Sequence, residues 1–116
     1  MVVWLIDGEQ WPRACLRAEL IERGYDALGF VNIDDAMESL LRGLSPRPKV
    51  IVIELRDQDI TTDRIDRICS LKVPIVIVGG SVELNQPAIQ ESKFPFILKR
   101  PVSLGEIADL VQRILE

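Results

Sequence analysis

The sequence contains no histidine, and this absence excludes several kinds of chemistry at once. Its 116 residues include 14 basic and 18 acidic side chains but no imidazole. Imidazole is the commonest general base near neutral pH and the commonest metal ligand in proteins. A hydrolase built on a nucleophile–histidine pair and a histidine-ligated metal centre are therefore excluded.

Cysteine is scarce as well. The two cysteines, Cys15 and Cys69, are far apart and fit no zinc-binding or redox spacing. Each falls in an apolar helical pattern, where a reduced thiol packed in the core is the expected state. Because such thiols suit a reducing compartment, we expect the protein to act in the cytoplasm.

Long apolar runs and basic clusters are also lacking. No run approaches the length of a membrane span, and the segment Met1–Ile6 lacks the basic flank of a signal peptide, so it predicts a buried strand. The net charge is −4, with the basic residues scattered among acids. Phosphate backbones require clustered lysine and arginine, so we expect neither a nucleic-acid nor a membrane partner.

What the chain does contain is five short apolar segments that alternate with helical patterns. These segments are Val2–Ile6, Ala27–Val31, Val50–Ile53, Ile75–Val78 and Phe96–Leu98. The third and fourth are apolar at every position, which is typical of strands covered on both faces by helices. We predict a single α/β domain over residues 1–116, with a five-stranded parallel sheet, helices on both faces and right-handed crossovers.

Five helices are predicted from start signals and apolar spacing. The first begins near Pro12 and ends before Gly24, the second spans residues 32–43, and the third begins near Thr61 or Thr62. A fourth, over residues 81–93, is interrupted by Pro87, and the fifth begins at a capping box of Ser103 and Glu106. The inward positions at helical spacing are Leu16 and Leu20; Ile33, Met37, Leu40 and Leu41; Ile65, Ile68 and Cys69; and Ile107, Leu110, Val111 and Ile114.

Function in such a sheet gathers at the carboxyl ends of the strands. The residues expected there are Asp7-Gly8-Glu9, Glu54, Gly79-Gly80-Ser81 and Lys99-Arg100-Pro101. A glycine-rich turn before a helix also suits phosphate or nucleotide binding. Because neither G-x-x-x-x-G-K nor G-x-G-x-x-G is present, a tight strand-to-helix turn is the favoured interpretation of Gly79-Gly80-Ser81.

Several stretches have the spacing of a known family. They are Ile6-Asp7-Gly8-Glu9 with Arg13, Leu16, Leu20, Gly24 and Tyr25 downstream; residues 48–55; residues 74–78; and Arg100-Pro101-Val102-Ser103 followed by Glu106-Ile107. In this order and at this spacing they resemble the receiver domains of bacterial two-component response regulators, over essentially the whole chain. The resemblance implies a flavodoxin-like (βα)5 receiver fold but does not by itself imply activity.

The resemblance also implies a role for each strand end, and the residue types depart from most of those roles. An active receiver uses an aspartate as phosphoacceptor, an acidic pair that holds magnesium, and a hydroxyl and a lysine that bind phosphoryl oxygens. The phosphoacceptor position holds Glu54, and the hydroxyl position holds Gly79. The acidic pair becomes Asp7 and Gly8, followed by Glu9, and the lysine position holds Arg100, or Lys99 if one residue is inserted.

These departures predict a degenerate receiver that is not an enzyme. We expect a phosphorylation-independent interaction module whose partner is another signalling protein or a fused output domain, with a homodimer as a further possibility. The alternative is a working receiver phosphorylated at an atypical residue such as Asp57. A third class, a small flavin-binding or enzymatic domain, has no supporting loop and no visible nucleophile–base pair.

Two pairs of interpretations remain open at the strand ends. Glu54 and Arg100 either form an ion pair, with Arg100-Pro101 in the cis form that the resemblance implies, or remain solvated and weakly coupled. We favour the ion pair. Asp7, Glu9 and Glu54 either collect Mg²⁺ weakly or form a residual acidic cluster balanced by Arg100 or Lys99, and we favour the cluster without metal or other cofactor.

The first helix carries a second apolar stripe. Trp11, Ala14, Ala18 and Ile21 share one side of it, opposite Leu16 and Leu20. One interpretation is an exposed contact surface. The other is that the alanines support the helix while Trp11 folds over the strand ends.

Overall fold

Five strands and six helices alternate along the chain. The computed structural model describes residues 1–116. The strands are β1 (Val2–Ile6), β2 (Asp26–Phe30), β3 (Val50–Glu54), β4 (Ile75–Gly79) and β5 (Phe96–Lys99). The helices are α1 (Gln10–Glu22), α2 (Ile33–Leu41), α3 (Thr62–Cys69), α4 (Ser81–Leu84), α5 (Pro87–Ser92) and α6 (Leu104–Leu115). The five predicted strands are confirmed, each within one or two residues of its predicted ends.

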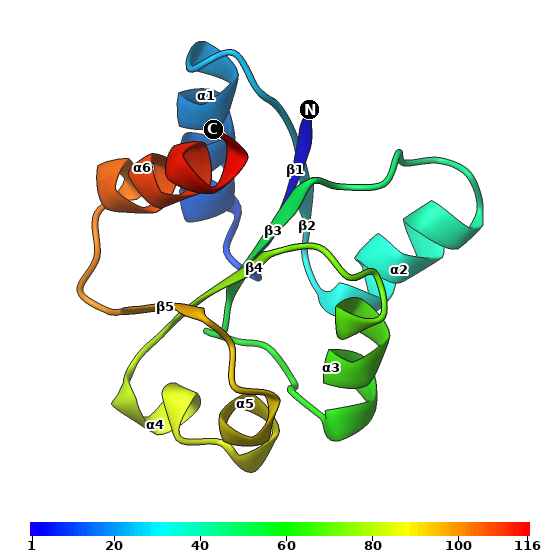
Figure 1. Cartoon of the computed structure of the whole chain (residues 1–116), viewed down its shortest axis with the longest axis vertical. Helices are drawn as coiled ribbons and strands as arrows, with labels where there is room; N and C mark the ends of the chain where they lie inside the picture. Colours follow the sequence, from blue (N-terminus) through cyan, green and yellow to red (C-terminus); the bar gives the residue numbers. More distant parts are fainter.

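All five strands are parallel and lie in the order β2-β1-β3-β4-β5. α1 and α6 cover one face of the sheet, and α2, α3 and α5 cover the other (Figure 1). The predicted doubly covered parallel sheet is therefore confirmed. Strand order reverses at β1, which has β2 on one side and β3 on the other, and this switch point places the ends of β1 and β3 side by side.

The two faces of the central strands differ in side-chain size. Isoleucines of β3 and β4 point toward α2, α3 and α5, whereas valines of the same strands point toward α1 and α6. Successive side chains of a strand point to opposite faces, so the alternating Val-Ile-Val-Ile pattern separates the two cores. The face toward α1 and α6 is thus lined by the smaller side chains.

Helix boundaries follow the predicted signals, with one difference in a cap. Pro87 interrupts the predicted fourth helix as expected, dividing it into α4 and α5, and it begins the second piece. At the start of α6, Ser103 Oγ accepts a hydrogen bond from Glu106 N at 3.0 Å. The Glu106 carboxylate returns to the Ser103 hydroxyl rather than to its backbone N–H, so only half of the predicted capping box forms.

Two predicted core positions are wrong. Leu41, at the last turn of α2, is 80% exposed, because the inward stripe of this short helix is completed by Ile33, Ala36 and Met37. Cys15 is exposed on α1 and is not a core thiol. Cys69 is partly buried against the core as predicted, and burial, assisted by the charge of Asp66, raises the pKa of its thiol. None of the six helices combines the length and the apolar character that a membrane span requires.

A matched pair of leucines tests this account of the core. Leu20, on the inward face of α1, is fully buried, whereas Leu41 of α2 is largely exposed. We expect Leu20→Ala to lower the free energy of unfolding by about 2–5 kcal/mol, and Leu41→Ala to change it by less than about 0.5 kcal/mol. Urea unfolding monitored by circular dichroism measures both, and equal losses in the two variants would contradict the assigned burial.

Candidate functional site

The carboxyl ends of β1, β3 and β5 bring charged side chains together at one edge of the sheet. Asp7 follows β1, Glu54 ends β3, and Arg100 follows β5. Residues 6 and 53 are paired neighbours, which sets Asp7 beside Glu54. Asp7 and Glu54 are also the only charged residues among the buried set, with exposed fractions of 8% and 9%. The sequence placed all three residues here correctly.

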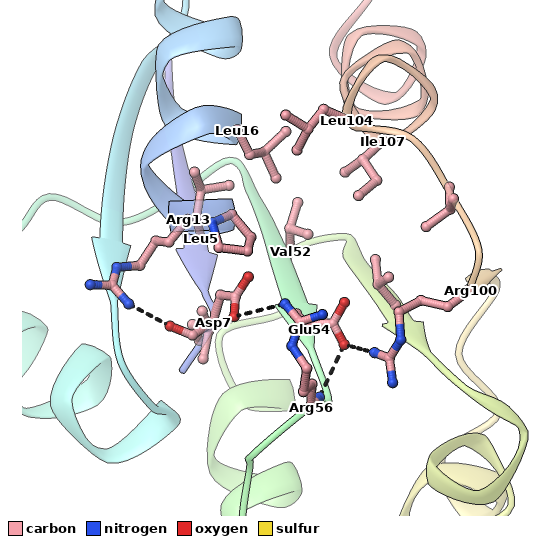
Figure 2. Close-up of a pocket in the computed structure, with 14 residues that line it drawn as sticks. Leu5, Asp7, Arg13, Leu16, Val52, Glu54, Arg56, Arg100, Leu104 and Ile107 are labelled. Atoms are coloured by element: carbon pink, nitrogen blue, oxygen red, sulfur yellow. Dashed lines mark hydrogen bonds and ion pairs between the residues drawn. The ribbon is translucent and has the colours of Figure 1, made fainter. Parts of the chain in front are cut away.

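Glu54 is held by an arginine. Its Oε1 accepts a hydrogen bond from Arg100 Nη1 and another from the backbone N–H of Arg56, at 3.0 Å (Figure 2). Burial alone would lower the pKa of Arg100, but the charges and hydrogen bonds of Glu54 and Glu83 together outweigh that effect and raise it. The predicted ion pair is confirmed, as is the cis Arg100-Pro101 bond.

Arg100 has a second partner that the sequence analysis missed. Its Nη2 donates to Oε1 of Glu83 in α4, and the same oxygen accepts a hydrogen bond from Gly80 N at 2.7 Å. The signal was present, because a glutamate three residues after the residue preceding a helix commonly caps it. Arg100 therefore connects the end of β3 to the first turn of α4. Hereafter we call Glu54, Arg100 and Glu83 the clamp.

A second arginine lies beside the acids at the end of β1. Arg56 Nε is 2.9 Å from Glu9 Oε1, an ion pair too bent for a hydrogen bond, and Arg56 Nη2 is 3.6 Å from Asp7 Oδ1. Arg13 Nη1 donates to the backbone oxygen of Asp7 at 2.7 Å. The positive charge beside Asp7 and Glu9 was not predicted, because Arg56 lies in a loop whose path only the folded chain defines.

The magnesium ion that the resemblance implies does not fit these residues. Gly8 removes one carboxylate, Arg56 presents a guanidinium to Asp7 and Glu9, and Arg100 neutralises Glu54. Nowhere in the chain do three or more acidic or sulfur side chains converge in a manner that suits a metal ion. Magnesium needs several hard oxygen ligands in near-octahedral geometry, and a neighbouring guanidinium repels it.

Gly79, at the position on β4 where the resemblance implies a hydroxyl, is closely surrounded by leucine side chains. A Cβ added to Gly79 would lie 3.0 Å from Leu55 Cδ1 and 3.3 Å from Leu84 Cδ2. A serine or threonine there would therefore require its apolar neighbours to shift. On β5, Lys99 pairs with Gly79 in the sheet and is exposed, so Arg100 is the residue that reaches the site.

Asp57, the alternative phosphoacceptor, lies apart from the clamp. It is exposed in the turn after β3, with φ of 60°, a conformation that aspartate tolerates better than most residues. It borders a separate surface hollow with Asn32, Asp34 and Arg64. No arginine or lysine contact holds its carboxylate.

The second stripe of α1 is open to solvent. Trp11 is 78% exposed and Ile21 is 45% exposed, and Ala14 and Ala18 between them are exposed as well. Trp11 therefore does not bury itself over the strand ends. Exposure of the stripe is confirmed, while its role as a contact surface stays a prediction.

Comparison with known proteins finds similarity at the level of structure. No protein-family model and no curated protein sequence matches the chain. The receiver domain of the TMAO respiratory system response regulator TorR superposes with a TM-score of 0.80 at 15% identity, covering 98% of this chain and 95% of that chain. The fold is the receiver fold.

Two further solved structures agree with it. A two-component response regulator from Clostridium difficile has a TM-score of 0.77 at 21% identity, over 99% of this chain and 95% of its own. A response regulator receiver protein from Pseudomonas putida has a TM-score of 0.77 at 25% identity, over 97% of this chain and 95% of its own. The flavodoxin-like receiver architecture expected from the sequence is thus confirmed.

The clamp can be measured by a double-mutant cycle. Because Glu54 is nearly buried, we expect Arg100→Gln and Glu54→Gln each to lower the free energy of unfolding by about 1.5–3 kcal/mol. The double variant should lose less than the sum, with a coupling energy of about 1–2 kcal/mol. Arg42→Gln, which breaks the exposed pair with Glu38, serves as control and should cost less than about 0.5 kcal/mol. Additive losses in the cycle would show that the clamp carries no net interaction.

Proposed function

We propose that this chain is a signalling interaction module with a receiver fold that works without phosphoryl transfer and is not an enzyme. The observation that carries the proposal is the clamp. Arg100 already neutralises Glu54, the residue in the phosphoacceptor position, and ties it to Glu83. The partner in this proposal is another signalling protein or a fused output domain.

Three features of the site together support the loss of phosphoryl transfer. A misplacement of about 1 Å can slow an in-line transfer by about 100-fold, and Glu54 carries one methylene more than aspartate. Arg56 replaces a metal charge that would bridge and neutralise phosphoryl oxygens. At Gly79 the hydroxyl is missing, and Leu55 and Leu84 occupy its surroundings. A single change is easily compensated, whereas these three remove the nucleophile geometry, the metal and an oxygen ligand.

The clamp also suggests how the module presents its surface. A charged, partly buried hydrogen-bonded pair holds its two elements in one arrangement more firmly than an exposed pair does. The ends of β3 and β5 and the first turn of α4 are joined in this way. We infer that the clamp holds this edge of the sheet in one arrangement, so that the module binds its partner without a phosphorylation signal.

Phosphodonors provide the direct test. With acetyl phosphate or beryllofluoride and magnesium, we expect no mass increase and no change in amide NMR spectra, because the acceptor geometry and the metal site are lost. An active receiver treated in parallel is the positive control. A stable gain of one phosphoryl group would refute the proposal, and its loss in Asp57→Asn would assign the modification to the alternative residue.

The exposed stripe of α1 is the contact surface that we propose. Complete burial of a large apolar side chain is worth roughly 1.5–3 kcal/mol. Trp11, at 78% exposed, forgoes most of that amount and Ile21, at 45% exposed, forgoes about half of it. We expect the chain to self-associate at high concentration in sedimentation experiments, and the double change of Trp11→Ser with Ile21→Lys to abolish this association without lowering thermal stability.

The outcomes of that experiment separate the possibilities. Unchanged association with a large loss of stability would assign both side chains to the core and contradict the proposal. A wild-type chain that stays monomeric would exclude the homodimer and leave another signalling protein as the partner. The Leu41→Ala variant, which removes an exposed apolar side chain from α2, is the matched control for a general loss of surface hydrophobicity.

A further inference from the structure

The charged side chains of α1 are drawn away from its outer face, which points away from the sheet (Figure 1). On one side, Arg17 Nε donates to the backbone oxygen of Ala27 in β2 at 2.8 Å. On the other, Arg23 pairs with Glu19 at 2.9 Å and with Asp109 of α6 at 2.7 Å. The exposed residues between these contacts are Trp11, Ala14, Cys15, Ala18 and Ile21, with Glu22 at the end of the helix.

The apolar residues of this face are spaced symmetrically about the level of Leu16. Trp11 and Ile21 lie five residues before and after that level, and the two alanines lie two residues before and after it. If a second copy of the helix is laid antiparallel about this level, Trp11 meets Ile21 of the second copy, and Ala14 meets Ala18. Contacts of this reciprocal kind define a two-fold interface between identical chains. The alanines at its centre allow the two helix axes to approach to about 8 Å.

The charges at the ends of α1 match the same arrangement. The helix has no acidic residue in its first turn, no basic residue in its last turn and no side-chain cap at its N-terminus. Glu22, exposed in the last turn, is therefore unfavourably placed in the dipole of its own helix. In the antiparallel pair, Glu22 lies level with Gln10 of the second copy. It then supplies negative charge to the N-terminus of that helix, which lacks it.

We propose that the outer face of α1 recognises a second copy of this chain, with the two α1 helices antiparallel. The inference rests on the contact surface put forward under the proposed function and adds the partner and its orientation. Trp11 is the only very large side chain of the face. The pairing therefore buries less than the about 1,200 Å² of a stable interface, and we expect a dissociation constant on the order of 0.1–1 mM.

Cys15 provides a chemical probe of this pairing. It is exposed at the edge of the stripe, and a two-fold axis at the level of Leu16 sets the two Cys15 side chains about 3 Å apart along the helix axis, on the same side of the pair. We expect a short bismaleimide to join two copies of the chain. The yield should fall at least ten-fold in Cys15→Ser and stay unchanged in Cys69→Ser, the matched control.

Moving the cysteine tests the orientation. Chains that carry Cys15→Ser with either Ala14→Cys or Ala18→Cys are mixed, one of them isotope-labelled so that intact mass distinguishes the products. Antiparallel pairing sets position 14 level with position 18 of the second copy, whereas two copies of position 14 are about 6 Å apart along the axis. We expect the mixed product to exceed each like-with-like product by more than the two-fold excess of random mixing. An excess of like-with-like products would overturn the antiparallel arrangement.

The end charges give a test that needs no cysteine. Gln10→Glu sets a second carboxylate level with Glu22 of the other copy, and Glu22→Lys sets a cation beside the positive end of that helix, so each should weaken association in sedimentation experiments. The double variant should restore it, because the new glutamate and lysine attract each other. Within one helix the two positions are about 18 Å apart, so the rescue acts between copies. Additive losses would contradict the orientation.

Failure of the pairing is distinguishable from failure of the proposed function. A chain that stays monomeric and gives no cross-linked product in any variant would refute self-recognition, and an absent response to phosphodonors would still support a phosphorylation-independent module. Conversely, gain of a phosphoryl group with cross-linking intact would refute that module and leave the pairing in place.

Discussion

The side chain of Arg100 connects the end of β3 to the first turn of α4. Its guanidinium contacts Glu54 at the end of β3 and Glu83 in α4, and the backbone N–H of Arg100 donates to the Gly79 oxygen at the end of β4. Arginine suits this role because its planar fork can serve two carboxylates at once and stays charged even when partly buried. The chemistry and the architecture of this edge of the sheet both depend on that contact.

The residues at the carboxyl edge of the sheet contact one another. Arg56 lies beside Asp7, Leu55 and Leu84 pack around Gly79, and Arg100 pairs with Glu54. Such pairing keeps the edge stable, since an unpaired buried charge would destabilise it.

The same edge opens into a cavity toward α1 and α6, while the outer side of α1 is exposed. These two features lie on opposite sides of one helix: Leu16 faces the cavity, and Trp11 with Ile21 faces solvent. The clamp lies on the other side of the carboxylates, next to α4.

Much of the fold followed from local patterns in the sequence. Continuous β-branched segments predicted buried parallel strands, and start signals such as Thr61 and Ser103 predicted where helices begin, because both depend on near neighbours in the chain. Helical spacing predicted the inward stripes but misjudged Leu41 and Cys15. The spacing defines the direction of a stripe and not its width, which depends on what packs against the helix.

The sequence by itself placed Glu54 and Arg100 at the same edge of the sheet, because parallel strands bring their carboxyl ends together. Only the tertiary structure decided that the two side chains pair, that Glu83 joins them, that Arg56 faces Asp7 and Glu9, and that Asp7 and Glu54 line a cavity. Those relations depend on the path of loops and on the distance between α1, α6 and the sheet. They are set by the packing of residues far apart in the chain, which local periodicity does not encode.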